Sequence, residues 1–178
     1  MRIAVLTTSK PSRELLRSEC VTSVKMQGLS AAEHVVMIDH HGEGPEVLHN
    51  RAVRELDSSI DWLAFLDDDD LMLPYHLEKL SAAATDADVV YSRCQLDLSC
   101  REFSAEGLRR KNYISMTSLV RRAMFERVEG FDEQHRGIGY DWRLWLRILD
   151  AGGRFKFVPD VTWIYRIQSD SMNWSACA

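Results

Sequence analysis

The sequence predicts a single α/β domain in which flanking helices cover a mostly parallel central sheet. Three apolar runs, "RIAVLTT" (2–8), "EHVVMID" (33–39) and "IDWLAFL" (60–66), have the length and composition of buried strands. Stretches with helical spacing separate them, and this alternation is typical of parallel α/β sheets. At 178 residues the chain has the size of one domain.

Proline and glycine delimit the helices of the first half. Proline is favoured at the first helical position because it lacks only an N–H that the first turn does not use. Pro11, Pro45 and Pro74 each begin a predicted helix, and Gly28 ends the first of them. The expected elements, in order, are strand 2–8, helix 11–27, strand 33–39, helix 45–56, strand 60–66, helix 74–84 and strand 87–97.

The second half of the chain is less regular. "DWRLWLRILDAGG" (141–153) predicts a helix, and "RFKFVPDVTWIYRI" (154–167) has the character of a strand. The expected apolar face of the helix, at i, i+3, i+4 and i+7, comprises Trp142, Trp145, Leu146 and Leu149. We expect this half to continue the same domain and to close over one edge of the sheet.

Composition and charge narrow the class of protein. The formal net charge of −5 argues against nucleic acid as the main partner, because that binding rests on a basic footprint. No stretch approaches the roughly 18–20 apolar residues of a transmembrane helix, and the opening run is too short for a secretory signal. We therefore expect a cytoplasmic protein. The cysteines form no C-x-x-C pair and the histidines no H-E-x-x-H motif, which excludes the common zinc and thioredoxin motifs.

Four consecutive aspartates, Asp67 to Asp70, follow the third predicted strand. Neighbouring carboxylates at about 5 Å repel by roughly 1–3 kcal/mol per pair, so we expect a cation among them. In an extended segment Asp67 and Asp69 share one face, and Asp68 and Asp70 share the other. A D-x-D pair on one face suits Mg²⁺ or Mn²⁺ bound together with phosphates. The alternative is a solvated acidic turn before the helix that begins at Pro74.

Other polar residues are expected at the same edge of the sheet. Ligands of open α/β sheets bind beyond the carboxyl ends of the strands, where Thr7 and Asp39 also fall. The chain has neither the G-x-x-x-x-G-K-[ST] of a P-loop nor a G-x-G-x-x-G after the first strand. The chain therefore has no glycine-rich loop to bind a phosphate, and we expect a metal ion to bind it instead.

Asp141 is the candidate general base. It opens the predicted helix 141–153, whose apolar face would anchor the carboxylate against the core. A carboxylate held within hydrogen-bond reach of a hydroxyl group can accept its proton. The alternative is that Asp141 is only the N-cap of this helix, a position that favours aspartate. Spacing alone does not decide between the two.

The order of these segments resembles glycosyltransferase family 2. The segments are "NRAV", "AFLDDDDLMLP", "ISMTSLVRRAMFERVEGFDE" and "DWRLWLRILDAGGRFKFVPDVTWIYR", and the likeness runs from Arg2 to about Ser171. It implies the GT-A fold, a Rossmann-like nucleotide-diphospho-sugar transferase fold. It also implies a UDP-, dTDP- or GDP-sugar donor, Mn²⁺ or Mg²⁺ as cofactor, and inverting transfer to the hydroxyl group of an unidentified acceptor. Residues 1–97 would then form the nucleotide- and metal-binding half and residues 98–178 the acceptor side.

The resemblance also implies roles for individual residues. Asp141 would be the catalytic base. Asp67 would face the ribose and join Asp69 and Asp70 in binding the metal that bridges the diphosphate. The expected substrate-binding residues are Thr7 and Asp39 near the nucleotide base, Asn50 and Arg51 in the "HNRA" segment, and Asp67 and Asp68 of the acidic segment.

Two positions depart from the family pattern. The family commonly has Glu–Asp where this chain has Tyr140–Asp141, which affects acceptor binding or the surroundings of the base. Many members place a metal-binding histidine where Gln168 stands, and Asp170 or a water molecule is the expected substitute. The alternative for this segment is a tail without a ligand. For Trp163, packing in the core is favoured over stacking on a sugar.

Two other functions compete with glycosyl transfer. "VVMIDHHGEG" matches the signature loop of the DHH phosphoesterases, in which Asp39, His40 and the aspartates would bind two metal ions. A GT-A-like domain that binds a nucleotide sugar without transferring it is the other alternative. Metal-dependent binding of a nucleoside diphosphate separates transferase from hydrolase, and an Asp141→Asn variant separates transferase from binding domain.

Overall fold

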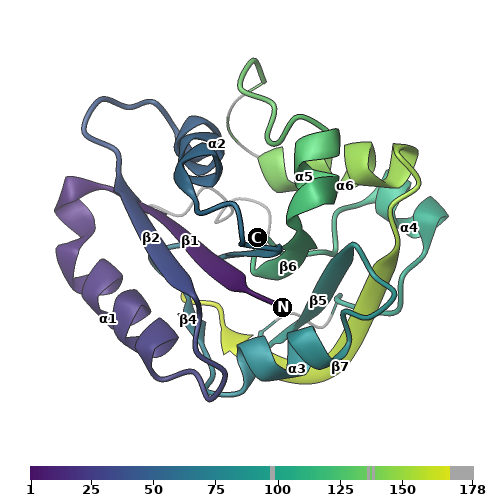
Figure 1. Ribbon diagram of the computed structural model, residues 1–178, viewed down its shortest axis with the longest axis horizontal. Helices are drawn as coiled ribbons and strands as arrows, with labels where there is room; N and C mark the ends of the chain where they lie inside the picture. The colour runs from purple at the N-terminus through teal and green to yellow at the C-terminus, as the bar shows by residue number, and fades with distance from the viewer. Residues whose placement is uncertain (97–98, 136, 138, 169–178) are drawn as a thin grey trace.

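The computed structural model of the protein describes residues 1–96, 99–135, 137 and 139–168. Within these residues, seven strands form one curled sheet, drawn in Figure 1 with helices on both sides. The strands are β1 (Ile3–Ser9), β2 (Glu33–Ile38), β3 (Trp62–Phe65), β4 (Leu71–Met72), β5 (Val89–Cys94), β6 (Ser118–Arg121) and β7 (Phe155–Ile164). The helices are a 3₁₀ turn (Pro11–Arg13), α1 (Glu14–Lys25), α2 (Pro45–Glu55), α3 (His76–Ala82), α4 (Ala105–Arg110), α5 (Arg122–Arg127) and α6 (Tyr140–Asp150).

The sheet is mostly parallel, as the sequence predicted. Its strand order is β2-β1-β3-β6-β5-β7-β4. The strands β1, β2, β3, β5 and β7 run in one direction, whereas β4 and β6 run in the other. All strands and helices expected in the first half are present, but sequence analysis did not find β4 and β6. The strand β6 lies between β3 and β5, so the second half of the chain completes the centre of the sheet.

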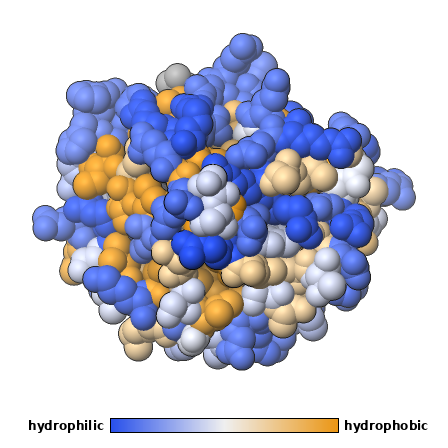
Figure 2. Space-filling model, viewed as in Figure 1, coloured by the Kyte–Doolittle hydropathy of each residue, from blue (hydrophilic) through white to orange (hydrophobic). Residues whose placement is uncertain are grey.

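The two faces of the sheet carry separate cores because side chains alternate along each strand. On β1, Val5 packs with residues of α1 and α3, whereas Ala4 and Leu6 pack with α2, α5 and α6. Figure 1 shows the same division of helices between the two sides. In the space-filling view of this face, hydrophobic patches lie over the side of α1 and β2, and the rest is mostly hydrophilic (Figure 2). Among the described residues, no helix combines the length and apolar character needed to cross a membrane.

The buried face of α6 differs from the one predicted. Leu144, Trp145 and Ile148 are fully buried, whereas Trp142 is half-buried and its indole N–H donates to the carbonyl oxygen of Leu108 (2.7 Å). The difference arises because α4 covers α6 from the side and leaves Trp142 at the seam between the two helices. Trp145 belongs to both the predicted and the observed face.

His49 occupies an apolar part of the core. Its imidazole lies 5.1 Å from the ring of Phe65 and 5.5 Å from that of Phe131, measured between centroids. The side chain is fully buried, and neither ring nitrogen has a hydrogen-bond partner among the described residues. Burial lowers the pKa of His49 to about 3, because the apolar surroundings disfavour the charged imidazolium. Between about pH 3 and pH 6.5, the folded protein therefore keeps His49 neutral, whereas the unfolded chain would protonate it.

We expect His49→Phe to stabilise the protein and to flatten its pH dependence. The folded pKa lies below the unfolded one, so the stability contributed by neutral His49 is present above about pH 6.5 and is lost as the pH falls toward 3. Phenylalanine removes this pH-dependent loss of stability. It also removes two buried ring nitrogens without hydrogen-bond partners, and a buried polar group without a partner typically costs about 1–3 kcal/mol of stability. Thermal unfolding at pH 7 and pH 5 measures the effect, and the gain should be larger at pH 5. An equal gain at both values would contradict the assigned cause.

Candidate active site

A cavity of about 610 Å³ opens at the carboxyl ends of the central strands. Its wall is built from the ends of β1 and β2, the four aspartates after β3, the segment 112–116 and the start of α6. Segments from both halves of the chain thus meet at the edge of the sheet where the sequence predicted ligand binding.

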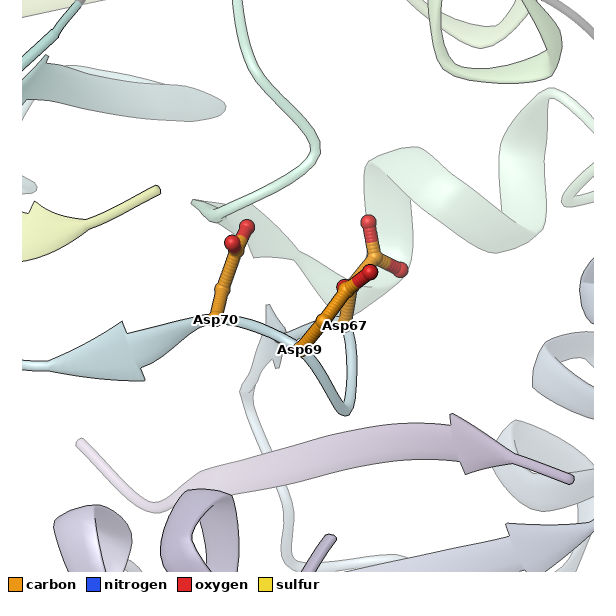
Figure 3. A group of neighbouring side chains, drawn as sticks. All are labelled: Asp67, Asp69 and Asp70. Atoms are coloured by element: carbon orange, nitrogen blue, oxygen red, sulfur yellow. The ribbon is translucent and has the colours of Figure 1, made fainter. Parts of the chain in front are cut away.

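The four aspartates form a tight turn, here called the aspartate turn (67–70). The backbone N–H of Asp70 donates to the carbonyl oxygen of Asp67 (3.0 Å), which closes the turn directly after the buried strand β3. Carboxylate oxygens of Asp67, Asp69 and Asp70 all lie within 4.8 Å of one another. Figure 3 shows these three side chains rising from the same side of the turn. The predicted alternation is therefore right for Asp67 and Asp69 and wrong for Asp70, because the segment turns instead of extending.

Asp68 lines the cavity with the other three aspartates, but its carboxylate is engaged by two partners of its own. Its Oδ2 accepts from the hydroxyl of Ser9 (2.6 Å), and its Oδ1 accepts from Nη1 of Arg13 (2.8 Å). The same Nη1 also donates to Oδ2 of Asp69 (3.2 Å). Asp68 is only 3% exposed, and its bond to Arg13 anchors the arginine at the wall of the cavity. The Asp68 carboxylate is not one of the three that are spaced to hold a metal ion.

Arg166 holds the backbone of the aspartate turn, and sequence analysis missed it. Its guanidinium donates to the carbonyl oxygens of Asp69 and Asp68, and it pairs with the carboxylate of Glu19 on α1. The backbone N–H of Arg166 also donates to Oδ1 of Asp70 (3.1 Å). Two arginines, Arg13 and Arg166, thus already offset part of the negative charge that led us to expect a cation.

The remaining electrostatics still favour a cation between Asp67, Asp69 and Asp70. Burial, with repulsion among the carboxylates added to it, raises the pKa of Asp67 to about 7 and that of Asp70 well above its ordinary value. Burial also raises the pKa of Asp69, although Arg13 opposes the shift. The carboxylate oxygens of these three residues already lie within 4.8 Å of one another, so they are grouped closely enough for all three to be ligands of one hard cation.

Asp141 faces the same cavity from the first turn of α6. Gly139 is the N-cap of this helix, so the alternative that Asp141 is merely the cap is wrong. Its Oδ2 accepts from the side-chain amide of Asn112 (2.9 Å), and its Oδ1 accepts from the backbone N–H of Trp142 (2.7 Å). Burial raises the pKa of Asp141, and these two hydrogen bonds oppose the shift. Each oxygen retains acceptor capacity, because a carboxylate has about four lone-pair sites.

Asn112 is a second residue that sequence analysis missed. It follows α4 closely in the chain, and its amide fixes the orientation of the Asp141 carboxylate. Its own Oδ1 accepts from the backbone N–H of Ile114 (3.2 Å). No sequence signal could have revealed the pair, because the contact joins positions 29 residues apart.

Tyr140, at the position where the resemblance to glycosyltransferase family 2 predicted a glutamate, is buried and lines the cavity. Burial and the nearby carboxylates of Asp67, Asp141 and Glu46 raise the pKa of the Tyr140 phenol well above its ordinary value. The group is therefore a neutral hydroxyl among acidic side chains. Glu46, at the start of α2, accepts from the backbone N–H of Gly137 (2.6 Å) and so ties α2 to the segment before α6.

The structure does not place Thr7 on the wall of the cavity. The Thr7 side chain is fully buried, and its hydroxyl bonds to Nε2 of His34 (3.1 Å) between β1 and β2. Side chains alternate along β1, so Thr8 lines the cavity in its place. Thr8 and Ser9 are lining residues that the sequence analysis missed.

Asn50 and Arg51 also differ from their expected positions. The amide of Asn50 donates to the carbonyl oxygen of Phe131 (2.9 Å) and to Glu133 (2.8 Å), and its Oδ1 accepts from the N–H of Phe131 (2.8 Å). Asn50 therefore fixes the loop after α5 instead of facing the cavity. Arg51 pairs with the carboxylate of Glu43, which does line the cavity.

Asp39 lines the cavity but is engaged by its own loop. Its carboxylate accepts from the backbone N–H groups of His41 (3.2 Å), Glu43 (2.9 Å) and Gly44 (3.0 Å). Burial opposes ionisation, but these bonds together hold the pKa of Asp39 below its ordinary value. In the part of the chain that the structure describes, Asp67, Asp69 and Asp70 are the one group spaced to hold a metal ion. Neither Asp39 nor His40 belongs to this group, so the described residues do not assemble the metal site of the phosphoesterase alternative.

The closing segment is described only in part. Trp163 is buried and lines the cavity, where its ring meets that of Tyr165 edge-on at 6.2 Å. Gln168 is half-buried. Asp170, the expected substitute for a histidine ligand, lies outside the described residues, so that expectation stays a prediction.

The sequence matches no protein-family model and none of the curated proteins compared with it. Solved structures do match. Over 98% of this chain and 61% of the other, the structure aligns with S. aureus TarS in complex with UDP-GlcNAc at a TM-score of 0.78 and 14% identity. A mannosyltransferase from Pyrobaculum calidifontis in complex with GDP-Man and Mn²⁺ matches at 0.70 and 14% identity, over 97% of this chain and 59% of the other.

A third match is the catalytic domain of Drosophila β1,4-galactosyltransferase 7 in complex with xylobiose, with a TM-score of 0.68 and 18% identity over 94% of this chain and 72% of the other. These similarities show that the chain has the GT-A fold, and the fold predicted from the sequence is confirmed. The chain spans 61% of the TarS chain with UDP-GlcNAc and 37% of another TarS chain.

Proposed function

We propose that the chain is a metal-dependent glycosyltransferase that moves a sugar from a nucleoside-diphosphate sugar to an acceptor hydroxyl with inversion at the anomeric carbon. One observation carries the proposal. Three carboxylates spaced for a metal ion and the separate, half-buried carboxylate of Asp141 line the same cavity. The first group suits a diphosphate held through a cation, and the second suits proton abstraction.

Asp141 would take the proton of the acceptor hydroxyl. The hydroxyl oxygen forms a bond to the anomeric carbon while the bond from that carbon to the diphosphate oxygen breaks, and the diphosphate leaves with the electron pair. Asn112 and the start of α6 hold the carboxylate in place, so the base does not have to be ordered during the reaction. The raised pKa of Asp141 makes it a better proton acceptor than an exposed aspartate.

Asp67, Asp69 and Asp70 would hold Mn²⁺ or Mg²⁺, the hard cations that carboxylate oxygens prefer. The cation, when bound, supplies stabilisation of the negative charge that develops on the leaving diphosphate. Arg166 keeps the turn in the shape that gathers the three carboxylates. Asp67 must lose its proton for this role, and its raised pKa means that metal binding should weaken as the pH falls below about 7.

The donor class is supported by the structures that share the fold. The TarS complex contains UDP-GlcNAc, and the Pyrobaculum mannosyltransferase complex contains GDP-Man and Mn²⁺. The galactosyltransferase 7 structures include one with manganese, UDP-Gal and xylobiose. We therefore propose a UDP-, dTDP- or GDP-sugar as donor. The acceptor is left as any molecule with an attacking hydroxyl group.

A thermal-shift panel tests the donor and the metal together. UDP, dTDP, GDP, ADP and CMP are each added with Mn²⁺, with Mg²⁺ and with EDTA. A ligand at about 100 times its Kd adds about 2.7 kcal/mol to the free energy of unfolding, which gives a clear rise in Tm. We expect at least one diphosphate to stabilise the protein with metal and not with EDTA. Stabilisation by metal alone, with no further gain from any nucleotide, would contradict the proposal.

A further inference from the structure

The cavity is more acidic than a site for a diphosphate should be. Beyond the aspartate turn, the side chains of Asp39, Glu43, Glu46 and Asp141 line it. Lys10 and Arg13 are the basic residues that line its described part. A nucleoside diphosphate brings several negative charges of its own, and one divalent cation offsets only two of them. A further cation beside the metal position is therefore needed on electrostatic grounds.

Arg13 stands at that position. Its guanidinium nitrogen Nη1 bridges Asp68 and Asp69, at 2.8 Å and 3.2 Å, and its side chain is 16% exposed. The two contacts are not equivalent. Asp68 is buried, is also bound by Ser9, and does not belong to the three gathered carboxylates. Asp69 does belong to them, so Arg13 shares Asp69 with any metal ion that binds.

We propose that Arg13 binds the diphosphate of the donor, and that it moves from Asp69 to the phosphate oxygens when a divalent cation takes up Asp69. The inference rests on the proposed function, because it assumes a diphosphate in this cavity. Asp68 keeps its contact with Arg13 throughout and acts as the pivot of the exchange.

The chemistry of arginine permits this exchange. The guanidinium carries five N–H donors in a planar fork, so one edge can remain on Asp68 while another binds a phosphate. Arginine–phosphate pairs are commonly bidentate and are stronger than neutral hydrogen bonds. Before the metal binds, Arg13 offsets part of the charge on Asp69 and therefore competes with the cation. After the metal has bound, the positive charge of Arg13 attracts the diphosphate.

Arg13→Gln should change two binding constants in opposite directions. Removing the competing cation should make Mn²⁺ alone bind more tightly, by about 3- to 10-fold. Removing the phosphate contact should make UDP, or GDP if the panel selects it, bind at least about 10-fold more weakly at saturating Mn²⁺. Isothermal titration calorimetry measures both constants. Arg54→Gln is the matched control, because Arg54 carries the same charge on an exposed part of α2 and should leave both constants unchanged.

Other outcomes overturn the inference. Unchanged affinity for the diphosphate in Arg13→Gln would show that Arg13 does not contact it. Weaker binding of both Mn²⁺ and the diphosphate would show that Arg13 only shapes the aspartate turn. Arg13→Lys covers the case in which the glutamine variant does not fold: it keeps the charge but loses the fork, and equal diphosphate affinity to wild type would contradict a bidentate contact. If wild-type protein binds Mn²⁺ but no diphosphate, the proposed function itself fails.

Discussion

Asp141→Asn should lower the rate of nucleoside-diphosphate release from the sugar nucleotide by about 10²–10⁴-fold, the range typical of losing a general base. Asparagine keeps the volume, but its single acceptor oxygen can retain only one of the two hydrogen bonds, from Asn112 or from the N–H of Trp142, and it cannot accept the proton. Binding of the metal and the diphosphate should be unchanged. The rate is measured as UDP or GDP release at saturating donor, and the affinity by calorimetry.

Asp150→Asn provides the control on the same helix. Asp150 lies at the far end of α6 and pairs with Arg109 on the surface, so its loss should leave the rate unchanged. Activity retained in Asp141→Asn would assign the base to another group. A wild-type protein that binds the sugar nucleotide but releases no diphosphate would favour the alternative of a binding domain without transfer activity.

Asp69→Asn should abolish metal-dependent binding of the nucleoside diphosphate. Substituting a residue that only orients a metal ligand already costs roughly 10- to 100-fold in affinity, so losing a ligand should cost at least as much. Without metal, the variant should be at least as stable as wild type, because burial and repulsion disfavour the charge on Asp69. Calorimetry with Mn²⁺ and with UDP or GDP measures the binding, and thermal unfolding with EDTA measures the stability.

Loss of metal-dependent binding without loss of stability in Asp69→Asn would identify a functional site and exclude a purely structural one. If the acidic cluster were a solvated turn that stabilises α3, Asp69→Asn would lower the Tm with EDTA and leave metal binding unaltered. Asp86→Asn is the matched control, because Asp86 is exposed in the loop after α3 and its loss should affect neither measurement.

The first half of the fold could be predicted because its signals are local. β1, β2, β3 and β5 are apolar runs bounded by turn residues, and prolines mark the helix starts. The strand β6 has only four residues and β4 only two, so neither produces a periodic pattern of useful length. Their positions depend on pairing with β3, β5 and β7, which no local signal encodes.

The acidic residues of the candidate site could be predicted because their signals lie in the local sequence. Four adjacent aspartates after a strand concentrate negative charge and led us to expect a cation. Asp141 was marked by its place at the start of an amphipathic helix together with the resemblance to glycosyltransferase family 2. The arginines could not be found in this way, since Arg166 reaches Asp69 across 97 residues of sequence. The expectation for Asn50 came from its place in a motif, whereas its observed role depends on Phe131, 81 residues later.

The central position of β6 has a consequence for how the chain is made. The pairings of β3 and β5 with β6, and of β5 with β7, involve segments that leave the ribosome after both earlier strands. Until then β3 and β5 present unpaired edges, which are sites for aggregation, and their closure depends on contacts distant in sequence, which slows folding. Residues 1–97 synthesised alone should therefore aggregate instead of forming a nucleotide-binding half. Coexpression of residues 98–178 should rescue solubility only if β6 of this fragment pairs with β3 and β5 before they aggregate.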